Sequence, residues 1–179
     1  MRHFLWIFIL LFGAAVAEGW AGGTGWALPA LAVTAFYLMQ VFGWRRPLLL
    51  GLFAGAIIDL GFGRPYPLTP LLVLPAIAGL ATLWHRSGSR HSLAMQMLPG
   101  ALCGLIQAGV ILAADSFAVE PWFWRLFLHN TLLLLALAGE GMLLLPLLCL
   151  AYDHWARRLA LPQYLTLHPP SGRPAIHVA

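Results

Sequence analysis

Apolar residues along the chain gather into six long stretches separated by short polar breaks. A helix needs about 20 apolar residues to cross the hydrocarbon core of a bilayer, and about 17 is the lower limit. Several stretches are shorter, so their helices are expected to include polar flanks or to break at proline or glycine. The pattern predicts an all-α polytopic membrane protein with six transmembrane helices, some short or kinked. The expected spans are about residues 4–17, 26–43, 47–62, 68–84, 93–114 and 126–152.

The link between the third and fourth stretches is the short segment GRPYP, residues 63–67, which predicts a tight hairpin. Thr69 and Pro70 follow it. Threonine is a common N-cap, and proline loses nothing at the first helical position, so this pair favours a helix start with Thr69 as the cap. Prolines within apolar stretches predict irregular helices at Pro75, Pro99 and Pro146.

Composition supports a membrane protein. Hydrophobic residues make up 61% of the chain and charged residues 9%, with a mean hydropathy of +0.83, whereas about a quarter of the residues in soluble domains are charged. The net charge of +4 comes from arginines that do not cluster on a soluble face, so no nucleic acid partner is expected. Residues 1–161 read as a single transmembrane domain. Residues 162–179, rich in proline and polar residues, read as a disordered cytoplasmic tail.

Arginine positions predict the orientation, because cytoplasmic loops retain positive charge. In a six-span arrangement both termini are expected to be cytoplasmic. The arginines on that side are Arg2, Arg45, Arg46, Arg86, Arg90, Arg157, Arg158 and Arg173, and those on the other side are Arg64 and Arg125.

The leading segment MRHFLWIFILLFGAAVAEG also fits a signal peptide cleaved after Ala17. A retained first span is favoured, because an apolar run rich in Phe and Trp at the start of a polytopic protein is usually its first helix. Cleavage would leave five spans in the same orientation.

Small residues and one acid form a stripe on the third span. Gly51, Gly55 and Asp59 recur every four residues, so they lie on one helix face. Two small residues four apart let another helix approach closely, and that helix could bring a hydrogen-bond donor to Asp59. The stripe therefore predicts helix packing or partner binding. Asp59 could instead pair with Arg64 at the outer surface or cap a helix end.

Buried polar residues are expected on the last two spans. Gly100, Gly104 and Gln107 form a similar stripe on the fifth span. On the sixth span His129 and Glu140 are three turns apart, about 16 Å along the axis, so they share a face without touching. A carboxylate inside a membrane usually faces the bundle interior or a wet cavity, so Glu140 needs a partner.

Signatures of catalysis are missing from the sequence. It holds no glycine-rich phosphate loop, no HExxH and no GxSxG, so no enzyme, catalytic residue or cofactor is expected. Cys103 and Cys149 lie in apolar runs without a CxxC partner, and His129 has no second ligand four residues away. No metal site is expected.

The stretch Gly51-x3-Gly55-Ala56-Ile57-Ile58-Asp59-Leu60-x2-Gly63 resembles the signature of MreD, the rod-shape-determining integral membrane protein of bacteria. Chain length, six spans and cytoplasmic termini also suit that family. The resemblance implies a non-catalytic, multi-pass scaffold subunit of the cell-wall elongation machinery in the bacterial inner membrane that helps to maintain cell shape. It implies binding to MreC, and through MreC to MreB, RodZ and the peptidoglycan synthases.

The MreD family in turn resembles the six-helix fold of the substrate-binding subunits of energy-coupling-factor vitamin transporters. Such a subunit is the alternative function. It would need a pocket near the outer face, built from residues such as Trp122, Trp124, Asn130 and Glu140. A small channel or a lipid-handling protein is a third possibility, based on Glu140 and the proline-broken helices.

Overall fold

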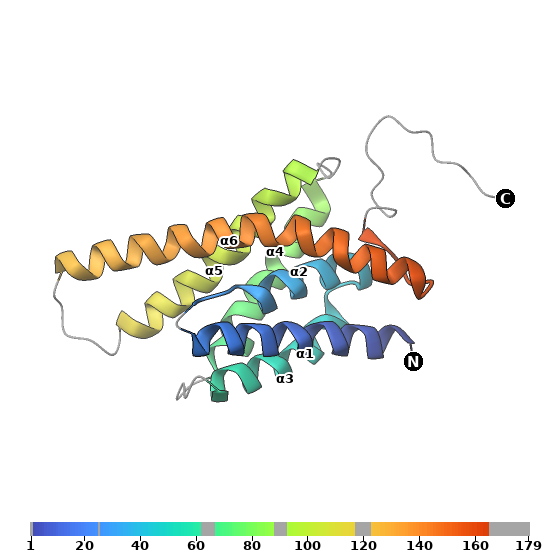
Figure 1. Cartoon of the computed structure of the whole chain (residues 1–179), viewed down its shortest axis with the longest axis horizontal. Helices are drawn as coiled ribbons and strands as arrows, with labels where there is room; N and C mark the ends of the chain where they lie inside the picture. The colour runs from blue at the N-terminus through green and yellow to red at the C-terminus, as the bar shows by residue number, and fades with distance from the viewer. Residues whose placement is uncertain (1, 25, 62–66, 88–92, 117–122, 165–179) are drawn as a thin grey trace.

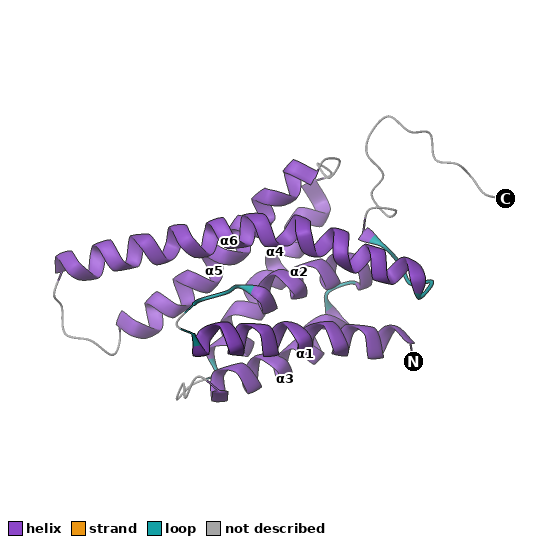
Figure 2. Ribbon diagram, in the orientation of Figure 1, coloured by secondary structure: helices purple, strands orange, loops and turns teal. Residues whose placement is uncertain are grey.

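The computed structural model describes residues 2–24, 26–61, 67–87, 93–116 and 123–164, and every regular element in these ranges is helical (Figure 2). The predicted all-α class is therefore confirmed for this part of the chain. The elements are α1 (Arg2–Gly23), α2 (Ala30–Phe42), α3 (Arg45–Gly61), a π-helical turn η1 (Thr69–Val73) leading into α4 (Leu74–Ser87), a 3-10 turn η2 (Leu93–Gln96) before α5 (Met97–Ser116), and α6 (Phe123–Arg158).

Helix α2 is the centre of the bundle. All residues from Ala30 to Gln40 are buried, and α2 contacts α1, α3, α4, α5 and α6 (Figure 1). It has 13 residues and starts later than its apolar stretch, directly after Pro29. It ends at Gly43, whose φ of 79° lies in the left-handed region that favours glycine. A helix of about 20 Å is therefore enclosed on all sides by its neighbours.

Two helices in the described part of the chain are long and apolar enough to cross a membrane: α1 and the Asn130–Arg158 part of α6. Helix α2 and the Met97–Ala113 part of α5 are apolar but shorter. With 36 residues, α6 is about 54 Å long and exceeds the predicted span at both ends. The hairpin of α5 and α6 projects beyond the end of α1, on the left of Figure 1.

The bundle is apolar outside and partly polar inside. Large apolar side chains are exposed along α1, α3 and α6, whereas several polar side chains are buried. Soluble monomers rarely expose continuous apolar surfaces of this kind. The exposed residues include Phe4, Phe8, Phe12, Val16, Phe53, Ile57, Leu60, Leu135, Leu143 and Leu147, and the buried polar residues are Glu18, Thr34, Gln40, Asp59, Thr69, Gln96, Gln107 and Asp153.

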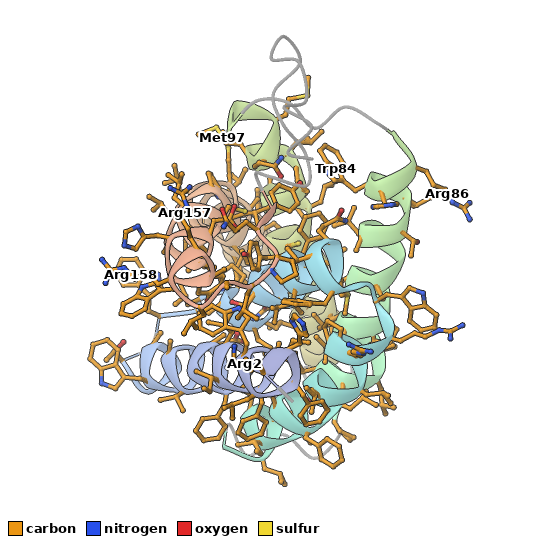
Figure 3. All side chains as sticks on the ribbon, turned by 90° about the vertical axis from the view of Figure 1, so that its right-hand side faces the viewer. Arg2, Trp84, Arg86, Met97, Arg157 and Arg158 are labelled. Atoms are coloured by element: carbon orange, nitrogen blue, oxygen red, sulfur yellow. The ribbon has the colours of Figure 1, made fainter. Side chains whose placement is uncertain are left out.

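Arginines gather at one end of the described bundle. Arg2, Arg86, Arg157 and Arg158 lie around the end face that Figure 3 presents to the viewer. The turn that leads into α3 lies at the same end, because Trp44 of this turn and Arg86 line the same cavity. The arginine end is the name used below for this face.

The ordered part of the chain continues past the predicted domain boundary at residue 161. Tyr164 is only 1% exposed, and its backbone N–H donates to Asp153 Oδ1 over 2.9 Å. The boundary therefore needs correction to at least Tyr164, because this aromatic side chain is buried in the core. The rest of the predicted tail, residues 165–179, lies outside the described residues.

Candidate functional site

Asp59 joins the end of α3 to the start of the next helix. Its side chain is 2% exposed, and it accepts hydrogen bonds from the backbone N–H and the hydroxyl of Thr69, each over 2.7 Å. The first N–H groups of a helix lack partners within the helix, and a carboxylate there also meets the positive end of the helix dipole. Asp59 is therefore an N-terminal cap supplied by the neighbouring helix.

The prediction that Thr69 itself is the N-cap is wrong. Leu68 occupies the N-cap position and makes no side-chain capping bond. The hydroxyl of Thr69 donates to Asp59 instead of accepting a hydrogen bond from its own helix. Pro70 does occupy one of the first two helical positions, as the sequence pattern indicates. Arg64, the other expected neighbour of Asp59, lies outside the described residues.

Gly51 and Gly55 face the same neighbouring helix as Asp59. A Cβ atom at Gly55 would lie 3.1 Å from Thr69 Cγ2 and 3.2 Å from Pro70 Cδ. At Gly51 it would lie 3.0 Å from Leu74 Cδ1. The stripe on α3 thus packs against the start of α4 within the chain, and Asp59 continues that contact.

The stripe on α5 packs against α6 more closely. A Cβ atom at Gly100 would overlap the carbonyl oxygen of Gly141, and one at Gly104 would overlap that of Leu137. One turn further, Gln107 Nε2 donates to Glu18 Oε1 over 2.7 Å. Gln107 is 7% exposed, so this hydrogen bond is inside the bundle.

Glu18 is a central residue that the sequence analysis did not select. It is 4% exposed, and its Oε2 accepts a hydrogen bond from the backbone N–H of Leu31 over 2.9 Å. Through Leu31 and Gln107 the carboxylate links α1 to the N-terminus of α2 and to α5. The available signal was a lone acid near the end of an apolar stretch, followed by a second helix start at Pro29.

Glu140 lies beside the loop between α1 and α2. Its Oε1 accepts a hydrogen bond from the indole N–H of Trp26. Its Oε2 is buried and has no hydrogen-bond partner among the described residues. An open groove of about 360 Å³ runs along this contact. The groove is lined by Thr24, Trp26, Ala27, Leu133, Ala136, Leu137 and Glu140.

The other residues of the predicted outer pocket are only partly described. Asn130 is half-buried in α6. The side chains of Trp124 and His129, and all of Trp122, lie outside the described residues. The structure therefore brings Glu140 together with Trp26, a residue that the sequence analysis did not include in this pocket.

A second cluster of buried polar side chains lies at the arginine end. Asp153 Oδ1 accepts hydrogen bonds from the hydroxyl of Tyr37 over 2.6 Å and from the backbone N–H of Tyr164. The hydroxyl of Tyr164 in turn donates to Gln96 Oε1 over 2.9 Å. These contacts join α2, α6, η2 and the segment after α6, so they hold the last described residues against the core.

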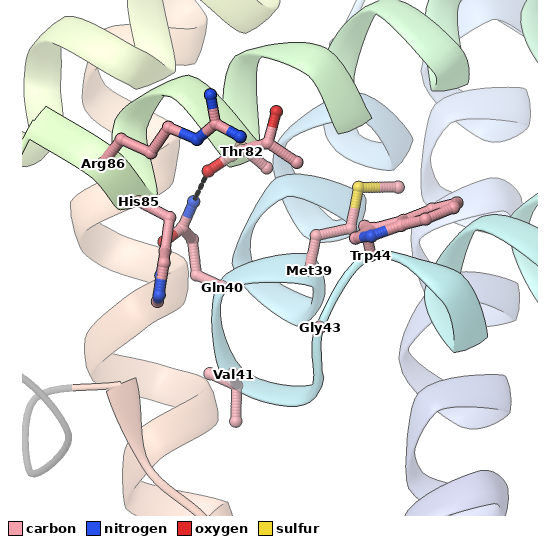
Figure 4. A pocket seen from close by; sticks show the side chains of 9 residues that line it. Met39, Gln40, Val41, Gly43, Trp44, Thr82, His85 and Arg86 are labelled. Atoms are coloured by element: carbon pink, nitrogen blue, oxygen red, sulfur yellow. Dashed lines mark hydrogen bonds between the residues drawn. The ribbon is translucent and has the colours of Figure 1, made fainter.

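Beside this cluster a cavity of about 590 Å³ lies between the end of α2 and α4 (Figure 4). Gln40 Nε2 donates to the carbonyl oxygen of Ala81 over 2.7 Å at its wall. Trp44, His85 and Arg86 also line it. The hydrogen bond of Gln40 ties α2 to α4 at the arginine end.

Chemical groups that could hold a metal ion do not come together in the described ranges, where no three His, Cys, Asp or Glu side chains form a suitable group. Cys103 and Cys149 are buried free thiols. The buried polar side chains named above instead form hydrogen bonds between helices.

Comparison of the chain with protein-family models, with curated proteins and with solved structures gives no match in any of the three. The class that the fold defines is an all-helical bundle with two helices able to cross a membrane.

Proposed function

We propose that this chain is a six-helix integral membrane protein of the bacterial inner membrane, with both termini in the cytoplasm. The proposal is supported by the large apolar side chains exposed along α1, α3 and α6, since soluble monomers rarely expose such surfaces. It is also supported by the arginine end, since positive charge is retained on the cytoplasmic side.

Within this class the chain is a non-catalytic scaffold subunit of the MreD type in the cell-wall elongation complex. The observation that supports this role best is the stripe of Gly51, Gly55 and Asp59, on which the resemblance rests. The stripe forms one structural unit with Thr69 at the end opposite the arginines. A glycine-rich helix face and a buried cap give a fixed α3–α4 hairpin, as a scaffold that presents a defined surface requires.

Asp59 acts indirectly in this proposal. A side chain that is 2% exposed does not touch a partner protein. It fixes the shape of the hairpin, and the exposed apolar residues of α3, such as Phe53 and Ile57, offer contact to a single-span partner of the MreC type. MreB, RodZ and the peptidoglycan synthases would be reached through that partner.

The test is substitution of Asp59, with an exposed residue of the next helix as control. Asp59→Ala removes the acceptor of two hydrogen bonds, each worth about 1.5–3 kcal/mol when the acceptor is a carboxylate, whereas Asp59→Asn keeps one acceptor oxygen. We expect the Ala variant to lower the amount of folded protein, the recovery of MreC after gentle detergent extraction and the fraction of rod-shaped cells. The Asn variant should have a smaller effect. Leu83→Ala is the control, because Leu83 is 65% exposed on α4 and lies outside the α3 surface assigned to the partner.

Unchanged cell shape, protein level and MreC recovery in both Asp59 variants would show that the assigned role is wrong. Mass spectrometry of the same extract distinguishes the alternative. Paired ATPases and a coupling subunit in place of MreC and wall synthases would identify a transporter component.

The alternative function, a substrate-binding subunit of a vitamin transporter, is favoured by one observation. Glu140 Oε2 lacks a partner among the described residues and lies beside the groove with Trp26. In this case a vitamin should remain bound through purification, and Glu140→Gln should weaken its retention. A purified chain free of any small molecule would count against this alternative.

A further inference from the structure

A cavity of about 550 Å³ separates the start of α1 from the end of α6 at the arginine end (Figure 3). Arg2 and Trp6 of α1 and Arg158 of α6 are among the residues that line it. The rest of the wall is almost entirely apolar and includes Leu5, Ile9, Leu159 and Leu161. The lining therefore combines two cationic side chains, one from each helix, with apolar side chains.

The turn after α6 builds one wall of this cavity. Ala160 has a φ of 51°, in the left-handed region. The N–H of Leu161 donates to the carbonyl oxygen of Ala156 over 2.9 Å, so the chain reverses in a Schellman turn directly after Arg158. This turn directs residues 159–161 back toward α1 and makes the wall part of the folded bundle.

The polar side chains that line the cavity, Arg2, Trp6 and Arg158, are all hydrogen-bond donors. Within the described residues neither Arg2 nor Arg158 has a hydrogen bond or ion pair, although Arg158 stacks on the ring of Trp155. The indole N–H of Trp6 is buried and has no acceptor there. Guanidinium groups bind phosphate oxygens through paired hydrogen bonds, so this set of donors suits a phosphate anion.

We propose that this cavity binds one anionic phospholipid of the cytoplasmic leaflet, with the headgroup phosphate between Arg2 and Arg158. An acyl chain would follow Leu5 and Ile9 along α1, where it replaces water at apolar surface. Basic pockets between transmembrane helices on the cytoplasmic side are typical places for such headgroups. The apolar wall favours a lipid over free phosphate. The inference rests on the membrane placement proposed above.

The test is a lipid titration of the purified full chain by native mass spectrometry, with phosphatidylglycerol, cardiolipin and phosphatidylethanolamine carrying the same acyl chains. We expect the two anionic lipids to be retained in preference to phosphatidylethanolamine. Arg2→Gln combined with Arg158→Gln should weaken their binding about 25-fold, from roughly a factor of five for each arginine near the lipid surface. Inorganic phosphate should fail to displace the lipid.

The matched control is Arg46→Gln combined with Arg157→Gln. It removes the same charge from exposed residues at the same end that do not line the cavity. Binding should stay close to that of the wild type. A second variant, Leu5→Trp, fills the apolar wall and keeps both charges, and it should also reduce lipid retention. It decides the question if the double arginine variant fails to fold.

Three results would overturn the proposal: equal losses in the test and control pairs, equal retention of phosphatidylethanolamine, or displacement by inorganic phosphate. The last would instead indicate a free-phosphate site. Extraction of membranes with alkaline carbonate separates this inference from the proposed function. A chain released by carbonate would refute the membrane placement, whereas a chain that stays in the membrane without lipid preference would refute the lipid site alone.

Discussion

Two glycine stripes that look alike in the sequence have different surroundings in the fold. Gly51 on α3 faces the Leu74 side chain, and Gly55 faces Thr69 and Pro70 of η1, including the Pro70 backbone nitrogen, with nearest hypothetical Cβ contacts of 3.0–3.2 Å. Gly100 and Gly104 on α5 face backbone carbonyl groups of α6 and leave no room for a methyl group. A side chain can rotate away, but a helix backbone can move only if the two helices separate. The same sequence pattern therefore predicts that two helices pack closely. It does not predict whether the contact has room for a methyl group at each glycine.

Both stripes continue into a polar side chain that lies one turn further on. On α3 this is Asp59, which binds the first N–H group of the following helix at Thr69. On α5 it is Gln107, which binds Glu18, and Glu18 in turn binds the N–H of Leu31 in the first turn of α2. In both cases a buried carboxylate accepts a hydrogen bond from a backbone N–H at the start of another helix.

The largest expected effect is at the α5–α6 contact. Gly104→Ala places a methyl group against the carbonyl oxygen of Leu137, so the two helices must separate. We expect a loss of about 3 kcal/mol or more in stability, the upper end of the range for overpacking. Thermal unfolding in detergent, followed by size-exclusion chromatography, measures this.

Gly109→Ala is the matched control on the same helix, because a Cβ atom there meets nothing within 4 Å. It should stabilise the protein by about 0.5–1 kcal/mol through the lower backbone entropy of alanine. Equal thermal stability in Gly104→Ala and Gly109→Ala would mean that the helices are not in contact.

The second-largest expected loss of stability is at Gln107, the polar end of the α5 stripe. Gln107→Leu keeps a similar volume and removes the hydrogen bond to Glu18. A hydrogen bond to a charged group contributes about 1.5–3 kcal/mol, so the same unfolding assay should show a clear loss. Leu105→Ala, at an exposed position of α5, is the control and should change much less. If Gln107→Leu left the thermal stability unchanged, the hydrogen bond to Glu18 would not stabilise the fold, and the polar ends of the two stripes would not have the same role.

The smallest expected effect is the difference in stability between the alanine variants of Gly51 and Gly55 on α3. Gly55→Ala brings a methyl group against Thr69 and Pro70, which Asp59 holds in place, and we expect a loss of about 1 kcal/mol. Gly51→Ala meets the movable end of the Leu74 side chain, so the helix preference of alanine should offset the contact. The two variants, compared in one unfolding assay, should rank in this order. The reverse order would contradict a fixed hairpin.

The sequence alone determined the all-helical class and most helix positions, because long apolar stretches with few breakers allow little else. It also placed Gly51, Gly55 and Asp59 on one face, and Gly100, Gly104 and Gln107 on another, since helical periodicity is local. It missed the role of Glu18 and the burial of Tyr164, and it assigned the wrong cap at Thr69. Each of these depends on residues distant in the chain.

The tertiary structure decided which groups meet. Glu18 reaches Gln107 across 89 positions, and Tyr37 reaches Asp153 across 116. The central place of α2 follows from contacts with five neighbouring helices, and the cavity between Arg2 and Arg158 joins the first helix to the last. Periodicity shows which face of a helix is small or polar. Only packing shows what that face contacts, because the partner is chosen by the shape of the whole bundle.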